Sequence, residues 1–243
     1  MKITAVTPHV VGHERNFLFV EVETDEGISG IGEAGITWQE PATVGYVTSL
    51  TQMLIGQDPF RTEHLWQLMF RGGFFPAGRI GCAAISAIDI ALWDIKAKAL
   101  GVPLYQLLGG KVRDRVVCYP HIRGNSTEEL VEQALAKQQE GWKFARFDPR
   151  IEPDGVTFEP VAATRRCIKD FAALREAVGD DMELIVDAHT RLDPTEAILL
   201  CRGLEPYRPY FVEDPIRMEN FDSFRKLSRH VNVPLAAGEQ YAS

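Results

Sequence analysis

Residues 113–243 alternate between short apolar segments and amphipathic ones, and this rhythm restricts the fold more than any other feature. Helical spacing is expected over 126–140, 158–178, 194–206 and 219–230. The apolar segments between them are RVVCYPHI (115–122), KFARFD (143–148), ELIVD (183–187), YFVED (210–214) and PLAAGE (234–239). Alternating strands and helices predict a parallel sheet, either doubly wound or closed into a barrel.

The number of these segments limits how much of a barrel they can build. An eight-stranded (β/α) barrel needs roughly 250 residues, whereas about five strands are expected within 113–243. A smaller open fold is the alternative. We favour an incomplete (β/α) TIM-type barrel in this second domain.

Residues 1–112 have a different pattern. Alternating side chains predict strands within 2–11 and 16–34, with a turn at Asp25-Glu26-Gly27. From Pro41 onward the spacing becomes helical, including a long stretch from Ile80 to Leu108. The sequence therefore predicts a small α+β domain before the barrel segment.

Composition excludes some classes of protein. A formal net charge of -8 disfavours a nucleic-acid surface, because phosphate binding requires clustered Lys and Arg. No window approaches about 18 uninterrupted apolar residues, so no membrane span is expected. The four cysteines form no CxxC pair, which is typical of reduced thiols. These features predict a soluble, cytoplasmic protein.

Three predicted strands end in a carboxylate at the same interval. Asp187 ends ELIVD, Glu213 ends YFVE and Glu239 ends PLAAGE, and each is 26 residues from the next. Because the carboxyl ends of parallel strands meet at one edge, about 4.8 Å apart, we expect these side chains to converge. Converging carboxylates repel one another unless a cation lies between them.

The predicted ligand chemistry points to a hard divalent ion. Oxygen ligands with room for water and substrate suit Mg²⁺, or Mn²⁺, better than Zn²⁺. The alternative is that these acidic residues only interact with helix N-termini. That role does not require the same spacing twice, so we expect Asp187, Glu213 and Glu239 to bind metal.

Further polar side chains follow two of these strands. His189 is two residues past Asp187, which places both on one side of an extended strand, so it is a candidate general acid or base. A structural histidine or a metal ligand is the alternative. By the same parity, Arg146 and Asp148 should project together, either to bind substrate or as a structural ion pair. Asp214 is expected to point away from this group.

Several motifs resemble the enolase superfamily, in its mandelate racemase and muconate lactonizing subgroup. They are SAIDIALWDIKAKALGVPLYQLLGG (86–110), VEVETDEGISGIGEA (20–34), IVDAH (185–189), FVEDP (211–215) and AAGE (236–239). The resemblance covers essentially the whole chain. It implies an α+β capping domain over 1–112, a modified barrel from 113 to 243, and Asp187, Glu213 and Glu239 as Mg²⁺ ligands for abstraction of a proton beside a carboxylate.

One departure from the family pattern narrows the reaction. Racemases and lactonizing members place Lys-x-Lys where this chain has Arg146-Phe147-Asp148. Together with Asp187 and His189, this pattern is most similar to galactonate-type acid-sugar dehydratases, hydro-lyases that convert an aldonate to a 2-keto-3-deoxy acid. The resemblance gives His189 the role of general acid, and it implies a His–Asp base on strands beyond residue 243.

The remaining expectations concern the substrate and the assembly. Turns around 13–16 and 36–39 are expected to contact the distal part of a sugar acid, with His13 and Trp38 as candidates, although local packing is the alternative for both. The resemblance implies a homo-oligomer. A cycloisomerase or epimerase on the same scaffold, and a non-catalytic metal-binding homologue, are the alternative functions.

Overall fold

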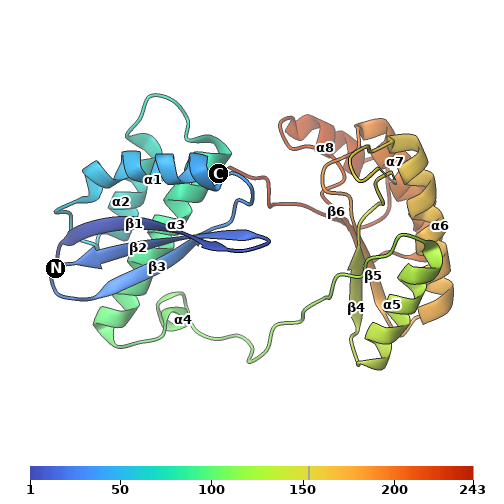
Figure 1. The fold of residues 1–243 in the computed structure, drawn as a ribbon, viewed down its shortest axis with the longest axis horizontal. Coiled ribbons are helices and arrows are strands. Elements are labelled where there is room, and N and C mark those ends of the chain that lie inside the picture. The colour runs from blue at the N-terminus through green and yellow to red at the C-terminus, as the bar shows by residue number, and fades with distance from the viewer. Residues whose placement is uncertain (153, 243) are drawn as a thin grey trace. The chain divides into compact units, whose positions relative to one another are not determined.

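The structure is a computed structural model that describes residues 1–152 and 154–242 (Figure 1). The chain divides into two compact units. The first comprises Met1–Asp114 together with Ala242, and the second comprises Arg115–Tyr241. Each unit has its own hydrophobic core, so the two are described separately.

The first unit begins with an antiparallel meander of three strands. These are β1 (Ile3–Gly12), β2 (Asn16–Thr24) and β3 (Ser29–Ala34), in that order across the sheet. On β2 the side chains of Leu18, Val20 and Val22 are buried and alternate with more exposed ones, as expected for a sheet with one face on the core.

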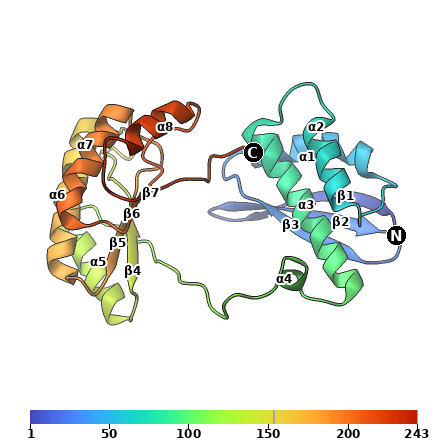
Figure 2. The same ribbon diagram turned by 180° about the vertical axis from the view of Figure 1, so that it is seen from behind.

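Four helices follow the meander, and the longest packs against β3 (Figure 2). They are α1 (Glu40–Leu54), α2 (Thr62–Arg71), α3 (Gly78–Leu100) and α4 (Leu104–Leu107). The helical stretch expected over 80–108 is thus divided into α3 and α4. Gly101 adopts a left-handed φ of 66° at the end of α3, and Pro103 precedes α4.

Two glycines allow α3 to approach β3 closely. A Cβ atom at Gly30 or Gly32 would overlap the carbonyl oxygen of Ala91 or Ala87 respectively, and backbone cannot move aside as a flexible side chain can. We expect Gly32→Ala to lower the free energy of unfolding by about 1–3 kcal/mol. Urea denaturation tests this. Gly45→Ala is the control: Gly45 is exposed within α1 with open space around it, so alanine there should stabilise.

Asp89 on α3 predicts a pH dependence of stability. Burial, with the charge of Glu63, raises the pKa of Asp89 to about 6. The unfolded carboxyl titrates near pH 4, so folding takes up a proton between pH 4 and 6, and stability falls as pH rises through this window. Asp89→Asn should therefore exceed the parent in stability at pH 7.5 by roughly 1–2 kcal/mol, allowing for partial exposure. Thermal melts at pH 3.5 and 7.5 test this, and an equal difference at both would contradict it.

The second unit contains a parallel sheet whose strands follow chain order. The strands are β4 (Phe144–Phe147), β5 (Glu183–Asp187), β6 (Phe211–Glu213) and β7 (Leu235–Ala236). The connecting helices are α5 (Thr127–Gln139), α6 (Pro160–Val178), α7 (Pro194–Leu204) with the short helix η1 (Glu205–Tyr207), and α8 (Phe221–Ser228).

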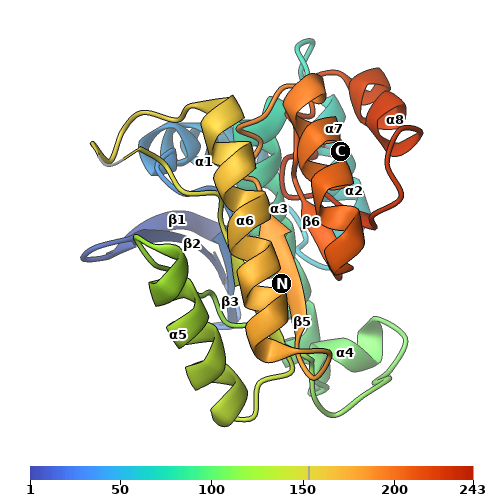
Figure 3. The same ribbon diagram turned by 90° about the vertical axis from the view of Figure 1, so that its right-hand side faces the viewer.

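The helices of this unit form a continuous layer. Helix α6 packs between α5 and α7, and α7 contacts α8, as Figure 3 shows. Because parallel crossovers are right-handed, strands in consecutive order place their helices on one face, whereas a doubly wound sheet reverses direction. The arrangement is therefore of the barrel type, although the described strands do not close a barrel.

One expected strand is not formed. Residues 115–119 are exposed, and only His121 makes a bridge, to Arg146 on β4. The amide of Ile122 donates to the carbonyl of Arg146, and the Arg146 amide donates to the carbonyl of Pro120. Proline has no amide hydrogen to extend the ladder. The prediction of a strand over 115–122, the first of the five expected, is therefore wrong beyond this single bridge.

No helix in the described part of the chain is both long and apolar enough to span a bilayer.

Candidate active site

Asp187 and Glu213 lie side by side at the carboxyl edge of the second sheet. They end β5 and β6 and are opposite each other in the parallel register. Asp187 is 1% exposed, and Glu213 is half-buried. The local sequence favours this arrangement because ELIVD and YFVE bury their apolar residues in the strand and place the carboxylate at its end. Both carboxylates face the same site.

Arg146 of β4 is the cation of this site. Its Nη1 lies 2.5 Å from Asp187 Oδ2 and 3.9 Å from Glu213 Oε2, and its Nη2 lies 3.2 Å from Asp148 Oδ1. Arg146 itself is 9% exposed. The expected proximity of Arg146 and Asp148 is present, but the shorter ion pair is the one with Asp187. A buried guanidinium requires such partners because removing a charge from water is costly.

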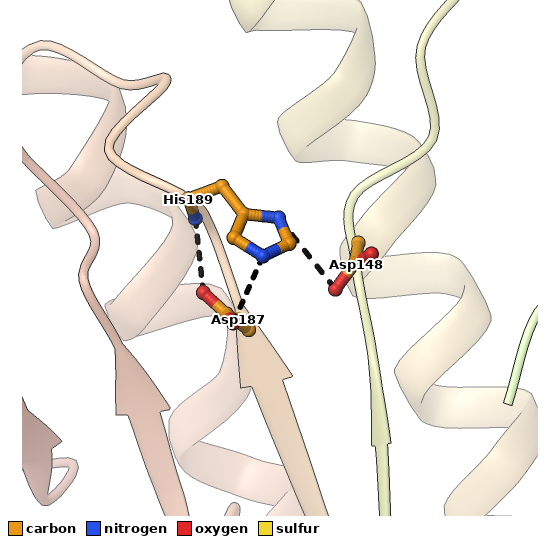
Figure 4. A group of neighbouring side chains, drawn as sticks. All are labelled: Asp148, Asp187 and His189. Atoms are coloured by element: carbon orange, nitrogen blue, oxygen red, sulfur yellow. Dashed lines mark hydrogen bonds and ion pairs between the residues drawn. The ribbon is translucent and has the colours of Figure 1, made fainter. Parts of the chain in front are cut away.

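His189 lies between two carboxylates (Figure 4). Its Nε2 is 3.2 Å from Asp187 Oδ2, and its Nδ1 is 3.7 Å from Asp148 Oδ1. The backbone does not continue as a strand, since His189 has a φ of 49°, and its amide donates to Asp187 Oδ1 at 3.0 Å. His189 lies beside Asp187 as expected, but the expected cause is wrong. A turn, and not an extended strand, brings the ring close to Asp187.

The pKa values of this pair shift in opposite directions. Burial acts to raise the pKa of Asp187, but the hydrogen bond and charge of His189, with Arg146, lower it overall. The hydrogen bond that His189 donates to Asp187 raises the pKa of His189 against the opposing effect of burial. Each group of the pair thus stabilises the charged form of the other.

Glu239 does not end a strand as expected, because β7 ends at Ala236, and Ala236 is the residue opposite Glu213 in the register. Glu239 belongs to the same electrostatic group through Asp214. Burial, and then the charge and hydrogen bond of Glu239, raise the pKa of Asp214 to about 7. Burial, followed by the charge of Asp187, raises the pKa of Glu213, and Glu239 adds to this. Asp214 is 1% exposed and has a φ of 37°, which ends the strand alternation. Asp214 therefore lies beside Glu239 and does not stand apart from the group as expected.

Two residues of this neighbourhood were not predicted from the sequence. Burial and the charge of Glu213 raise the pKa of Tyr119, and burial and the charge of Arg146 lower the pKa of His121. Both follow the apolar run 116–118, and the bridge from His121 to Arg146 brings them to the sheet edge. The end of a short apolar run was the available signal, because that is where the other site residues were found.

His13 and Trp38 lie in the first unit. His13 is exposed in the turn after β1, and Trp38 is 85% exposed with a φ of 67°. A hydrogen bond of 3.0 Å from Arg15 Nη2 to Thr37 Oγ1 links the two turns that carry them. The exposure of Trp38 argues against local packing as its role.

The carboxylate group has the chemistry of a magnesium site. Glu213 Oε2 is buried and accepts no hydrogen bond from the described residues, and Arg146 Nη1 is 3.9 Å away, so a cation bound there would compensate this acceptor. Asp187, Glu213 and Glu239 supply only oxygen ligands, which suits Mg²⁺. A second set, Asp148, Asp187 and His189, has ligand atoms within 4.8 Å of one another. Both sets include Asp187.

Comparison with known proteins identifies the family. The model of the mandelate racemase / muconate lactonizing enzyme N-terminal domain matches residues 3–109, and that of the enolase C-terminal domain-like family matches 129–243. A solved structure of an enolase superfamily member from Salmonella Typhimurium is 34% identical with a TM-score of 0.92, covering 98% of this chain and 68% of that one. The chain belongs to the enolase superfamily. The predicted family and fold class are confirmed.

Named relatives within the enolase superfamily are similar over most of this chain. A D-mannonate dehydratase from Caulobacter sp. (strain K31) is 38% identical over 94% of this chain and 62% of its own length. A D-galactonate dehydratase from Ralstonia nicotianae is 38% identical over 100% of this chain and 63% of its own length. The structure of an enolase from Pantoea ananatis, solved with bound D-gluconate and Mg, is 33% identical with a TM-score of 0.91. The match covers 100% of this chain and 66% of that one. The chain spans less than two thirds of the length of these relatives.

Proposed function

We propose that this chain carries the cap and the metal-binding strands of a Mg²⁺-dependent dehydratase, a hydro-lyase that converts an aldonate to a 2-keto-3-deoxy acid. The observation that carries the proposal is the pairing of Asp187 with Glu213 in the sheet register, with His189 in contact with Asp187. The names of the dehydratase relatives and the gluconate-bound neighbour support the choice of substrate class.

Asp187, Glu213 and Glu239 are assigned to the metal. When bound, Mg²⁺ supplies positive charge that stabilises the enediolate formed as the α-proton leaves. The protein contributes the separation and burial of the ligands: a strand end fixes each of the first two, and the low-polarity surroundings of Asp187 strengthen its attraction to a cation.

His189 is assigned as the general acid. Loss of the β-hydroxyl as water requires a proton on the departing oxygen, and the protonated ring of His189 can donate it and become neutral. The contacts with Asp187 and Asp148 hold the ring in place, with its nitrogens 3.2 and 3.7 Å from carboxylate oxygens. The base that removes the α-proton is proposed to be a His–Asp pair outside this sequence.

Arg146 and Asp148 are assigned to substrate binding. A guanidinium fork matches a carboxylate or a pair of hydroxyl groups, and Asp148 accepts hydrogen bonds from hydroxyls. Arginine also replaces the lysine that a two-base racemase would require on β4, which favours dehydration over racemisation. His13 and Trp38 are proposed to contact the distal end of the sugar acid.

The proposal also covers the location and the assembly of the protein. We propose a cytoplasmic homo-oligomer that acts on a small molecule without nucleic-acid or membrane partners, and the net charge of -8 supports the absence of a nucleic-acid partner. Sedimentation of the whole gene product at several concentrations tests the oligomeric state.

A substrate screen tests the proposed activity. The whole gene product with Mg²⁺ is incubated with a library of acid sugars, and formation of 2-keto-3-deoxy acid is measured. We expect turnover of one or a few aldonates, loss of turnover with a chelator, and a decrease of about 100-fold or more in His189→Ala. Metal binding without turnover would favour a cycloisomerase, an epimerase or a non-catalytic homologue.

A further inference from the structure

A cavity of about 750 Å³ lies in the second unit beside the carboxylate site. It is bounded by the start of α5 and by the loop that follows β4. Its charged lining residues are Arg123, Glu129, Asp148, Arg150, Glu152 and Arg191. Asp148 connects the cavity to the site, since its carboxylate lies within 4.8 Å of ligand atoms of Asp187 and His189.

The acidic residues of this cavity are already engaged. Asp148 pairs with Arg146 at 3.2 Å, and Glu152 pairs with Arg166 at 2.7 Å. Glu129 accepts the amide of Asn125 at 2.7 Å, in the positive field at the N-terminus of α5. Each carboxylate therefore has a donor other than Arg123 and Arg191.

Arg150 is neutralised as well. Its guanidinium binds both oxygens of Asp170, at 3.1 and 2.8 Å, and donates to the carbonyl of Asn125 at 2.6 Å. Asp170 is 1% exposed, so this bidentate pair is a fixed part of the cavity wall.

Arg123 and Arg191 remain without an anionic partner among the described residues. The Arg191 guanidinium lies 5.5 Å from the centre of the Phe158 ring, a contact that orients it without neutralising it. With the engaged pairs set aside, the lining has two free guanidinium groups and one carboxylate held by a helix N-terminus. This excess of positive charge favours an anion, and the volume of the cavity suits a small organic ligand.

We infer that this cavity binds a second anionic group of the substrate, a carboxylate or a phosphate, through Arg123 and Arg191. The inference rests on the proposed function and extends its substrate class from aldonates to acid sugars that carry a second anionic group. The first carboxylate would lie at the metal ligands, and Asp148 marks where the sugar chain passes from one site to the other.

Three substrate classes test the inference on the whole gene product with Mg²⁺. They are aldonates, with one carboxylate; aldarates, with two; and aldonates phosphorylated at the far end. We expect kcat/KM to be at least about 10-fold higher for one of the two dianionic classes, and the preferred class identifies the anion. Arg123→Gln and Arg191→Gln should each reduce that preference by about 10-fold. Arg165→Gln, an exposed arginine on α6 outside the cavity lining, should not change it.

A binding measurement separates this inference from the proposed function. Inorganic phosphate is titrated into the protein by calorimetry, and binding should weaken at least 10-fold in the Arg123→Gln/Arg191→Gln double variant. Loss of this binding without turnover of any sugar acid would support the anion site while contradicting the dehydratase. Turnover of all three classes with equal kcat/KM, unchanged in both variants, would overturn the inference and leave the dehydratase standing.

Discussion

Asp187→Asn is expected to weaken Mg²⁺ binding by about 100-fold or more and to abolish turnover, because it removes the ligand shared by both candidate metal sets. Asparagine keeps the shape of the side chain and loses the charge. Calorimetric titration of the protein with Mg²⁺ measures the effect. Asp193→Asn, at the N-cap of α7 with no side-chain cap bond, is the matched control and should bind Mg²⁺ as the parent does.

Two further variants decide which set binds the ion. If Asp187, Glu213 and Glu239 are the ligands, Glu213→Gln should weaken Mg²⁺ binding strongly and His189→Ala only slightly. If Asp148, Asp187 and His189 are the ligands, the order is reversed. Retention of full Mg²⁺ affinity in Glu213→Gln would therefore contradict the assignment of Glu213 as a metal ligand.

The largest effect on stability is expected at Asp170. This carboxylate on α6 accepts two hydrogen bonds from Arg150 and one from Thr127 Oγ1 at 2.7 Å, and it is 1% exposed. Removing one partner of a buried ion pair leaves the other charge uncompensated, which costs about 3–5 kcal/mol. Asp170→Asn should lower the free energy of unfolding by roughly this amount in urea titrations.

The control for this prediction is an exposed ion pair. Asp222 and Arg225 are 3.0 Å apart, with side chains 80% and 66% exposed. Asp222→Asn should change stability by less than about 1 kcal/mol. Equal losses in the two variants would show that the Asp170 network is no more stabilising than a surface pair.

The network also positions the active-site edge. Arg150 is two residues past Asp148, and its three bonds fix the loop between β4 and the cavity. A displaced Asp148 would weaken substrate binding more than metal binding. Asp170→Asn is therefore expected to raise KM for the preferred acid sugar in addition to reducing stability.

Much of the second unit followed from patterns within short windows. The helix expected over 126–140 spans Thr127–Gln139, and Ser126 accepts a hydrogen bond from the amide of Glu129 as its N-cap. The repeated interval of 26 residues predicted that Asp187 and Glu213 are neighbours, because each strand–helix unit advances the chain by one strand. These features depend on local periodicity and on the register of a parallel sheet, which a sequence displays directly.

Other features of the site depend on tertiary contacts and left no local signal. The pair of Arg150 with Asp170 joins residues 20 apart, and either side chain alone resembles a surface charge. The contact of Arg146 with Asp187 requires β4 and β5 to be adjacent. His189 reaches Asp187 through a left-handed residue, where glycine or asparagine would be the usual signal. The segment 115–122 has strand composition but pairs only at His121.

Deuterium exchange tests whether the carboxylates and His189 serve proton abstraction followed by loss of water. The His189→Ala variant of the whole gene product is incubated in D₂O with Mg²⁺ and the acid sugar that the parent dehydrates, and NMR follows the proton at C2. We expect exchange at C2 with dehydration reduced by about 100-fold or more, because abstraction continues while the leaving hydroxyl lacks its acid. Undiminished dehydration in this variant would contradict the account.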